Sequence, residues 1–462
     1  MVQFGLRAGP GKREKCTLLL QTDPLHRGYH VCMAAPTPQS LVLSFEDARL
    51  VVEEHAAQIP PGADEVVDLL HASGRILAEP ITADRDIPPF PRSTRDGYAV
   101  RSADLTKLPA RLIVVGEIKA GPRPSPVPLV LNSGQVFSIM TGAPVPQGAD
   151  AVVMVEYTSS SLSSQNIVEI TKGVDAGENI VAQAAEARSG SLLLGRREQL
   201  DHAAIALAAS VGKSRLQVFV RPRVAVLTTG DEIVDVDGRP GPTQIRNSNT
   251  YSLAAQIQEA GGEAVLLPIA PDEPHRLRRL IEQGLESDLL IMTGGVSMGR
   301  YDLVEQVLSE MKAEFLFTGA RIQPGRPVVF GRVPLGHKEG AGAATPAAAL
   351  LKYFFGLPGN PVSTMVTFEL FARPILEALA GTSPHPLVFV HARLKSEIRV
   401  KTGLRRFLPA VFSGQHENSQ AELVPWQGSG DIAARSRANC YIVIPPDREQ
   451  ISAGDWVAIM LR

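Results

Sequence analysis

Cysteine is scarce in this sequence. Among its 462 residues there are three cysteines, Cys16, Cys32 and Cys440, which lie far apart and form no CxxC pair. A disulfide framework needs an even set of closely spaced cysteines, and a structural zinc site needs paired ones, so neither is expected. Free thiols are typical of a reducing compartment, and we expect a cytoplasmic protein.

Long apolar runs are also missing. A membrane-spanning helix needs about 20 consecutive apolar residues, and no segment of this chain approaches that length. The apolar run Leu18–Leu20 is too short for the core of a signal peptide. Residues 1–40 show no periodicity and are rich in glycine, proline and basic residues. We expect them to be a disordered extension, or to lie upstream of a true start at Met33.

An excess of charge of either sign is absent as well. The formal net charge is −2, which excludes a general attraction to nucleic acid or to an anionic membrane. Any site for an anion must therefore be local. Hydrophobic residues at 44% and charged residues at 20% are typical of a globular protein. A chain of this length predicts roughly two to four domains.

The predicted secondary structure changes from segment to segment along the chain, which predicts several domains. Residues 41–83 and 183–219 have helical patterns and form one discontinuous part. Residues 84–182 consist of short strands between proline and glycine turns, which predicts an inserted β domain. Strands alternate with helices over 220–380, which predicts a mostly parallel sheet covered on both faces. Residues 381–462 are again all-β and predict a small barrel or sandwich.

Several local patterns predict single elements. Ser44 starts a capping box, and an apolar face over residues 45–59 predicts a helix. His55 on that face is interpreted as a packed residue rather than a ligand. A short helix is expected around 72–78, and Asp201 is expected to cap a helix that begins there.

The stretch from 287 to 308 organises the α/β region. Its apolar run Leu289–Met292 is typical of a buried parallel strand, and a glycine-rich turn follows at 293–299. In an open α/β sheet, ligands bind just beyond the carboxyl ends of the strands. Two more strand-to-loop junctions, at 224–232 and 353–363, have the same form. We expect all three to converge on one ligand site.

Carboxylates occur at these strand and helix ends. Asp231 and Glu232 follow the first strand, where they either hold Mg²⁺ through oxygen ligands or form a solvated turn. Asp302 fits the N-cap of the helix that it opens, and a capping carboxylate at a ligand-facing helix start still reaches a metal. Asp272 lies at another helix start of this kind.

Two further segments offer groups for an anion. Arg321 and Arg326 flank a Pro-Gly turn, and guanidinium suits bidentate capture of phosphate or a tetrahedral oxyanion; a solvated charged loop is the alternative. In the segment 357–364 a strand ends, the backbone turns sharply and Pro361 begins a helix. The start of that helix is expected to offer unpaired N–H groups to an anion.

Two polar residues of the inserted β region complete the set. Asp96 precedes a glycine turn and Thr141 follows a strand, and neither signal is specific alone.

Together and in order, these segments resemble the molybdopterin molybdenumtransferase family, which includes MoeA and the E domain of gephyrin. The match runs over roughly residues 40–462. Its motifs are DGYAV (96–100), TGAPVP (141–146), TTGDEI (228–233), QIRNSNTYSL (244–253), TGGVSMGRYD (293–302), PGRP (324–327), LPGNPVS (357–363) and GSGDI (428–432).

The resemblance implies four domains: an elongated helical linker domain, the inserted β domain, a molybdopterin-binding α/β domain and a C-terminal β-barrel. It implies a homodimer whose site lies between the α/β domain of one chain and the inserted β domain of its partner. The implied reaction inserts molybdate into adenylyl-molybdopterin and releases AMP, assisted by Mg²⁺. Other enzymes of cofactor biosynthesis are conceivable partners, whereas nucleic acid and membrane are not expected.

The same resemblance assigns roles to residues. Asp96, Thr141, Glu232 and Asp302 are expected to be catalytic, with Asp96 and Thr141 contributed by the partner chain. Asp272, Glu232 and Asp302 are expected to hold the metal. The expected substrate-binding positions are Gly294, Gly295, Ser297, Arg321, Pro324, Gly325, Arg326, Pro358, Gly359, Asn360, Pro361 and Ser363.

The chain departs from the family pattern at four positions. Ala182 and Ala187 stand where the family has an arginine and an aspartate, Arg95 replaces a methionine, and Gln323 stands where a lysine is common. Lost charge predicts weaker binding of metal or substrate, and hence a slower enzyme or one with altered substrate preference. A non-catalytic scaffold of the same fold is therefore the second hypothesis. The third is another enzyme that shares only the α/β domain, such as the adenylyltransferase of the preceding step; the β domain and the barrel argue against it.

Overall fold

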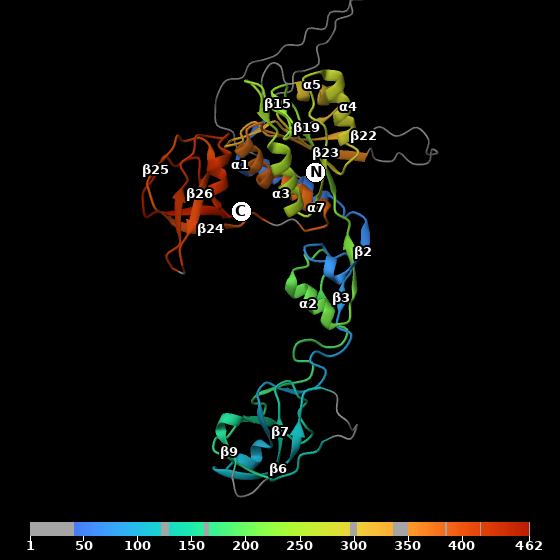
Figure 1. Ribbon diagram of the computed structural model, residues 1–462, viewed down its shortest axis with the longest axis vertical. Helices are drawn as coiled ribbons and strands as arrows, with labels where there is room; N and C mark the ends of the chain where they lie inside the picture. The colour runs from blue at the N-terminus through green and yellow to red at the C-terminus, as the bar shows by residue number, and fades with distance from the viewer. Residues whose placement is uncertain are drawn as a thin grey trace, which may run out of the picture. The chain divides into compact units, whose positions relative to one another are not determined.

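The structure is a computed structural model that describes residues 41–121, 129–160, 166–295, 303–335, 350–383, 386–415 and 417–461 (Figure 1). Ser297 and Asp302, which were assigned to the site, lie outside these ranges, as do residues 1–40. Within the described ranges, no helix is both long and apolar enough to cross a membrane.

The first helix, α1 (Phe45–Gln58), begins where the sequence predicts. The Ser44 hydroxyl accepts a hydrogen bond from the backbone amide three residues later at 3.0 Å, so the predicted cap is confirmed. His55 packs edge-on against the ring of Phe330, and its Nδ1 lies 3.2 Å from the hydroxyl of Tyr353. Burial lowers the pKa of this imidazole. Its interpretation as a packed residue is confirmed.

Two segments that are far apart in sequence pair in the next part of the structure. Strand β2 (Asp64–Asp68) runs antiparallel to β13 (Arg215–Phe219). Helix α2 (His202–Ser210) precedes β13, and the carboxylate of Asp201 caps it by accepting from the amide of Ala204 at 2.8 Å, as predicted. The chain therefore leaves this part, forms the inserted β region and returns.

The helix expected around 72–78 is wrong. A 3-10 turn at Leu69–His71 is present, and the chain after it is not helical. Gly74 has a φ of 73°, which is incompatible with a right-handed helix. The amide of Ala78 donates to the carbonyl of Gln217 on β13 instead. Residues 76–78 pair with β13, and this pairing uses backbone N–H and C=O groups that a helix would need for its own hydrogen bonds.

The inserted β region forms one sheet from β5 (Gly97–Val100), β6 (Ala110–Ile118), β7 (Gln135–Ile139), β8 (Ala151–Met154), β9 (Thr158–Ser160) and β10 (Ile167–Ile170). The order is β8-β5-β7-β6-β10-β9, and β6 with β7 is the parallel pair. Gly97 packs tightly on β8, because a Cβ added to it would lie 1.9 Å from the carbonyl oxygen of Val153.

The α/β region is built on a sheet of β14 (Arg223–Thr228), β17 (Glu263–Leu266), β18 (Leu289–Thr293), β19 (Glu314–Phe317), β22 (Val329–Leu335) and β23 (Leu350–Leu357). The order is β17-β14-β18-β23-β22-β19. The first four strands are mutually parallel; β22 pairs antiparallel with β23, and β19 pairs antiparallel with β22. The predicted mostly parallel sheet is therefore confirmed.

Helices cover both faces of this sheet (Figure 1): α3 (Asn249–Glu259), α4 (Pro274–Gly284), α5 (Leu303–Glu310), α6 (Pro361–Thr367) and α7 (Arg373–Leu379). A π-helical segment, Phe368–Ala372, joins α6 to α7. In β18, Leu289 and Ile291 enter the core shared with α3, whereas Leu290 and Met292 enter the core shared with α4 and α5. Burial on both faces explains why this strand is apolar throughout.

The C-terminal region is a closed barrel of β24 (Phe389–Leu394), β26 (Arg405–Ser413), β27 (Gln420–Leu423), β28 (Cys440–Ile444) and β30 (Trp456–Leu461). The strands follow the order β26-β27-β24-β30-β28, and β28 pairs again with β26, which closes the ring. Helix α8 (Ile432–Arg437) lies between β27 and β28. Strand β21 (Ile322–Gln323) of the α/β region pairs with β26, so main-chain bonds connect the two regions.

Short two-stranded pairs complete the described part of the chain. They are β1 (Val42–Leu43) with β20 (Gly319–Ala320), β3 (Ile81–Thr82) with β12 (Leu192–Leu194), β4 (Arg92–Ser93) with β11 (Ile180–Val181), β15 (Ile233–Val234) with β16 (Ile245–Arg246), and β25 (Ile398–Arg399) with β29 (Gln450–Ile451). The pair β4–β11 joins the two connections of the inserted region.

Candidate functional site

The carboxyl ends of β14, β18 and β23 lie side by side, as the sequence predicts. Thr228 pairs with Thr293, and Thr293 pairs with Leu357. The amide of Thr229 donates to the carbonyl of Thr293 at 3.0 Å, which carries the pairing one residue past β14. The three loops that follow these strands therefore start from one line across the sheet.

Two glycine turns touch each other at this edge. Gly294 has a φ of 87°, and a Cβ added to it would lie 2.4 Å from the carbonyl oxygen of Thr229. A Cβ added to Gly359 would lie 3.5 Å from the Cα of Gly294. Gly295, also at positive φ, lies against the hydroxyl of Thr229. Glycine permits this φ and this close approach of backbone to backbone.

A buried asparagine, for which sequence reasoning proposed no role, ties the two turns together. Asn249, the first residue of α3, donates from Nδ2 to the hydroxyl of Thr293 at 2.9 Å and to the carbonyl of Gly359 at 2.8 Å. The hydroxyl of Thr293 donates in turn to the carbonyl of Pro358 at 3.1 Å. The sequence signal that could have pointed to Asn249 was the motif at 244–253, which was used only for the family resemblance.

Three carboxylates crowd the corner beyond β14. Oδ1 of Asp231 accepts from the backbone amide of Asp272 at 3.2 Å, and the carboxylate of Glu232 folds back beside Gly230. Burial, with the negative charges of Asp231 and Glu232, raises the pKa of Asp272 above its ordinary value. A bound cation would remove the repulsion among these three carboxylates.

The donors in this corner fit Mg²⁺ in part. The described residues contain no group of three or more His, Cys, Asp or Glu side chains arranged around one ion. Mg²⁺ usually keeps several waters and takes one or two carboxylates together with substrate phosphate oxygens. On that count the carboxylates of Glu232 and Asp272 would be enough protein ligands. Asp302, the third residue expected at the metal, lies outside the described residues.

Replacing Asp272 tests the charge of this corner through pH. Because its folded-state pKa is raised, Asp272 resists deprotonation in the folded protein, and stability is lost as the pH rises through that pKa. We expect Asp272→Asn to raise the urea midpoint at about pH 7 relative to wild type, and the difference to vanish as the pH falls toward the ordinary value of 3.8.

Equilibrium unfolding at several pH values measures this difference. Added Mg²⁺ is expected to reverse the order, since an ion bound to the folded wild type stabilises it. A difference that is constant across the pH range would show that Asp272 does not feel the neighbouring charges.

The Pro-Gly turn that carries Arg321 and Arg326 packs on α6. Gly325 has a φ of 104°, and a Cβ there would lie 2.4 Å from Cγ2 of Thr367 and 3.6 Å from the carbonyl oxygen of Ser363. Arg326 lines a hollow of about 270 Å³ beside β1 and β20. Both arginines are exposed, and within the described part of the chain neither pairs with a carboxylate. Their charge is available to an anion.

The start of α6 is less open than the sequence predicts. The amide of Val362 donates to the carbonyl of Ser429 in the barrel at 3.0 Å, and Nδ2 of Asn360 donates to the hydroxyl of Ser429 at 2.9 Å. Pro361 has no amide hydrogen, which leaves the amide of Ser363 as the first-turn donor without an acceptor among the described residues. The expected free N–H groups are therefore reduced, because a barrel loop caps the amide of Val362 and leaves that of Ser363.

Ser429 itself was missed by sequence reasoning. Its segment, 428–432, contributed to the family resemblance but carried no role. A serine between two glycines is common in loops, and its contact with Asn360 depends on how the barrel packs. No local pattern could have revealed it.

Asp96 and Thr141 contact each other in the inserted β region. One carboxylate oxygen of Asp96 accepts from both the amide of Thr141, at 2.6 Å, and its hydroxyl, at 2.9 Å. These hydrogen bonds hold the pKa of Asp96 below its ordinary value. Both residues are exposed. The pair thus presents a fixed negative charge and a hydroxyl at one point of the surface.

The departures at Ala182 and Ala187 lie on a connection of the inserted region. Gln183 donates to a carboxylate oxygen of Asp86 at 2.8 Å, and Glu186 pairs with a guanidinium of β4 at 3.2 Å. Both contacts are at the surface, where such pairs contribute little to stability. Gln183 and Glu186 therefore link the outgoing and returning segments of the inserted region, although residues 182 and 187 are uncharged here.

The structure brings most of the expected site residues of the α/β region together. Contacts along the sheet edge join Gly294, Pro358, Gly359 and Asn360, and Gly325 lies against Ser363 on α6, with Pro324 and Pro361 as chain neighbours. Gly295 lies against Thr229, and Glu232 and Asp272 lie in the charged corner beyond β14. Asp96 and Thr141 form a separate pair. Ser297 and Asp302 lie outside the described residues.

Three domain-family models match the chain in order. The one described as the MoeA N-terminal region (domain I and II) matches residues 43–212. The one described as a probable molybdopterin binding domain matches residues 225–378, and the one described as the MoeA C-terminal region (domain IV) matches residues 391–461.

Relatives and solved structures agree with these matches. A molybdopterin molybdenumtransferase of Nostoc sp. is 36% identical over 407 residues, which are 86% of this chain and 88% of the relative. One of Synechococcus elongatus is 32% identical and covers 91% of this chain and 99% of the relative. The crystal structure of the molybdopterin biosynthesis MoeA protein of Pyrococcus horikoshii OT3 has a TM-score of 0.72 at 27% identity, covering 91% of this chain and 100% of that one.

Proposed function

This chain belongs to the molybdopterin molybdenumtransferase (MoeA) family, and from that premise we propose that it inserts molybdate into adenylyl-molybdopterin and releases AMP. It is a transferase of molybdenum cofactor biosynthesis. Cys440 is a free, buried thiol, in keeping with a reducing cytoplasm as the place of the reaction.

The observation that carries the proposal is the contact between the turns at Gly294 and Gly359 on the carboxyl edge of the sheet. Ligands of open α/β sheets bind at this edge, and backbone without side chains lets a phosphoanhydride approach closely. The exposed guanidiniums of Arg321 and Arg326 belong to the turn that packs against α6, the helix that begins after Gly359. They suit molybdate, which is a tetrahedral dianion.

Glu232 and Asp272 are the residues that would hold Mg²⁺. When bound, the ion neutralises charge on the phosphoanhydride and helps AMP to leave. Asp231 orients Asp272 by accepting its amide hydrogen. Asp302 joins this set by family match.

Asp96 and Thr141 are contributed by the partner chain of a homodimer in this proposal. Large apolar side chains of the linker part are exposed in the single chain, among them Leu70 at 91% and Val66 and Leu192 at 64% each. These side chains support the proposal of an interaction face in the linker part. Sedimentation of the purified protein as a monomer at micromolar concentration would remove this part of the proposal.

The alternatives explain less of the chain. A non-catalytic scaffold is not favoured, because relatives named as transferases match most of the chain. An adenylyltransferase that shares only the α/β domain is not favoured either, because the MoeA N-terminal and C-terminal regions also match.

The deciding experiment is AMP release from adenylyl-molybdopterin by the purified protein. We expect release that depends on both molybdate and Mg²⁺. Complementation of a strain that lacks this step, with Glu232→Ala and Asp302→Ala as controls, tests the same reaction in cells. Folded protein that binds the pterin but releases no AMP would favour the scaffold. Equal rescue by wild type and both variants would remove the site assignment, and a normal rate would dismiss the slow-enzyme hypothesis drawn from Ala182 and Ala187.

A further inference from the structure

We propose that Asn249 is a positioning residue, whose side-chain amide fixes the spacing between the turn after β18 and the turn after β23. The identity of the substrate held by these turns rests on the proposed function. The role of Asn249 itself rests on its own contacts.

The hydrogen bonds of Asn249 define one orientation of its amide. The carbonyl oxygen of Gly359 only accepts, so Nδ2 rather than Oδ1 must face it, at 2.8 Å. The second Nδ2 hydrogen goes to the hydroxyl of Thr293 at 2.9 Å, and that hydroxyl passes its own hydrogen to the carbonyl of Pro358 at 3.1 Å. The side chains of Asn249 and Thr293 thus hold β18 to two successive carbonyls of the other loop.

Beyond the strands, the described chain makes this connection through the side chains of Asn249 and Thr293. The last ladder pair between β18 and β23 is Thr293 with Leu357, and no backbone hydrogen bond joins residues 294–295 to residues 358–360 within the described ranges. The two turns touch through Gly294 and Gly359, which is a contact without a directional bond. Their separation is therefore set by Asn249, which bonds directly to Gly359 and orients the hydroxyl of Thr293 toward Pro358.

Asn249 acts through these turns rather than on the substrate. Its exposed fraction is 8% and that of Thr293 is 0%, whereas Gly359 is exposed. The amide lies beneath the turns, and the backbone that it holds lies at the surface. A displacement of about 1 Å in such a turn lowers catalytic efficiency about 100-fold.

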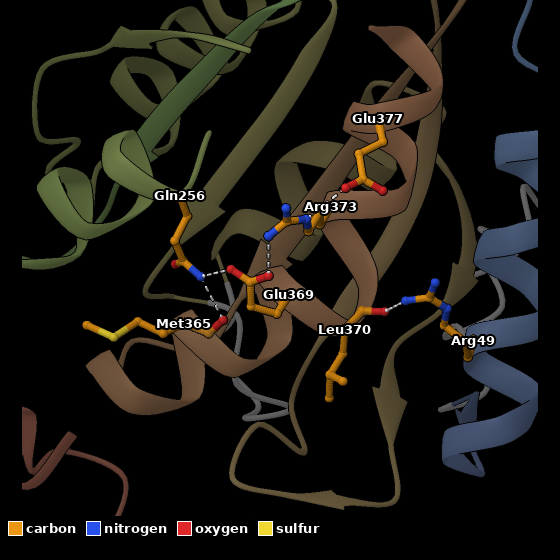
Figure 2. A network of polar contacts seen from close by, with 7 residues as sticks. All are labelled: Arg49, Gln256, Met365, Glu369, Leu370, Arg373 and Glu377. Atoms are coloured by element: carbon orange, nitrogen blue, oxygen red, sulfur yellow. Dashed lines mark hydrogen bonds and ion pairs between the residues drawn. The ribbon is translucent and has the colours of Figure 1, made fainter. Parts of the chain in front are cut away.

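The same helix carries a matched amide away from the site. Gln256 on α3 donates from Nε2 to the carbonyl of Met365 at 3.1 Å and to a carboxylate oxygen of Glu369 at 2.6 Å (Figure 2). Its Oε1, like Oδ1 of Asn249, is buried without a partner among the described residues. Asn249→Ala and Gln256→Ala therefore remove two hydrogen bonds each from one helix, but only the first loosens the strand ends.

The test compares these two variants in the full chain. We expect Asn249→Ala to lower kcat/KM for adenylyl-molybdopterin about 10- to 100-fold, chiefly by raising KM, and Gln256→Ala to change it less than about threefold. Urea midpoints of the two variants are expected to fall by similar amounts. Equilibrium binding of adenylyl-molybdopterin without molybdate should show the same difference between them.

The outcomes separate this inference from the proposed function. If wild type releases no AMP, the function fails, while the binding comparison still tests Asn249. If wild type is active and the two variants lose the same activity, the positioning role is overturned and the function stands. Should Asn249→Ala fail to fold, Asn249→Ser, which keeps a polar group at this position, takes its place under the same criteria.

Discussion

Gly294→Ala is expected to lower kcat/KM for adenylyl-molybdopterin by about 100-fold or more while the protein remains folded. Two causes act together at this position. The backbone has a φ of 87°, which alanine adopts with strain, and the new Cβ would lie 2.4 Å from the carbonyl oxygen of Thr229. The turn must move, and Gly359, which contacts Gly294, must adjust with it.

A control variant separates the effect of the Cβ clash from the effect of the unfavourable φ. Gly261, at the end of α3 far along the helix from Asn249, has a φ of 86°, but a Cβ there meets nothing within 4 Å. Gly261→Ala therefore introduces the same unfavourable φ without a clash. We expect a modest loss of stability and near-normal turnover. Steady-state kinetics and thermal unfolding of both variants measure the difference, and equal activity of the two would show that the Gly294 turn does not hold substrate.

Glu232→Gln is expected to lower turnover about 100-fold at low Mg²⁺ and to raise the Mg²⁺ concentration for half-maximal activity at least about tenfold. The substitution keeps the shape of the side chain but removes one of the three charges in the corner with Asp231 and Asp272. With less repulsion, the pKa of Asp272 falls back toward its ordinary value, because the charge of Glu232 is one of the causes that raise it.

Activity measured against Mg²⁺ concentration checks this prediction. Glu263→Gln is the control, since Glu263 is an exposed carboxylate at the first residue of β17, on the amino edge of the same sheet. It is expected to leave the Mg²⁺ dependence unchanged. If Glu232→Gln behaves like Glu263→Gln, the metal lies elsewhere.

The barrel takes part in the site rather than forming a separate appendage. Ser429 caps the first free amide of α6 and holds the side chain of Asn360. The loop that carries Asn360 is thus restrained from two directions, by α3 through Asn249 and by the barrel through Ser429. Changes in the packing of the barrel are therefore expected to reach the substrate turns.

Residues close together in sequence were enough to determine several elements of this protein. The caps at Ser44 and Asp201 depend on neighbours within one helical turn, and β18 on an unbroken apolar run, so the sequence alone predicts them. The three strand-to-loop junctions also follow from sequence, because parallel strands end at one edge. The family resemblance added the order of the domains.

Only the tertiary structure decided which distant groups meet. The helix expected around 72–78 is replaced by an extended segment because a strand from residue 215 onward offers backbone partners. One of the free amides expected at α6, that of Val362, is capped by Ser429, and the spacing of the turns is held by Asn249. Each of these contacts joins residues far apart in the chain, and its free energy depends on burial and hydrogen-bond geometry that no local pattern encodes.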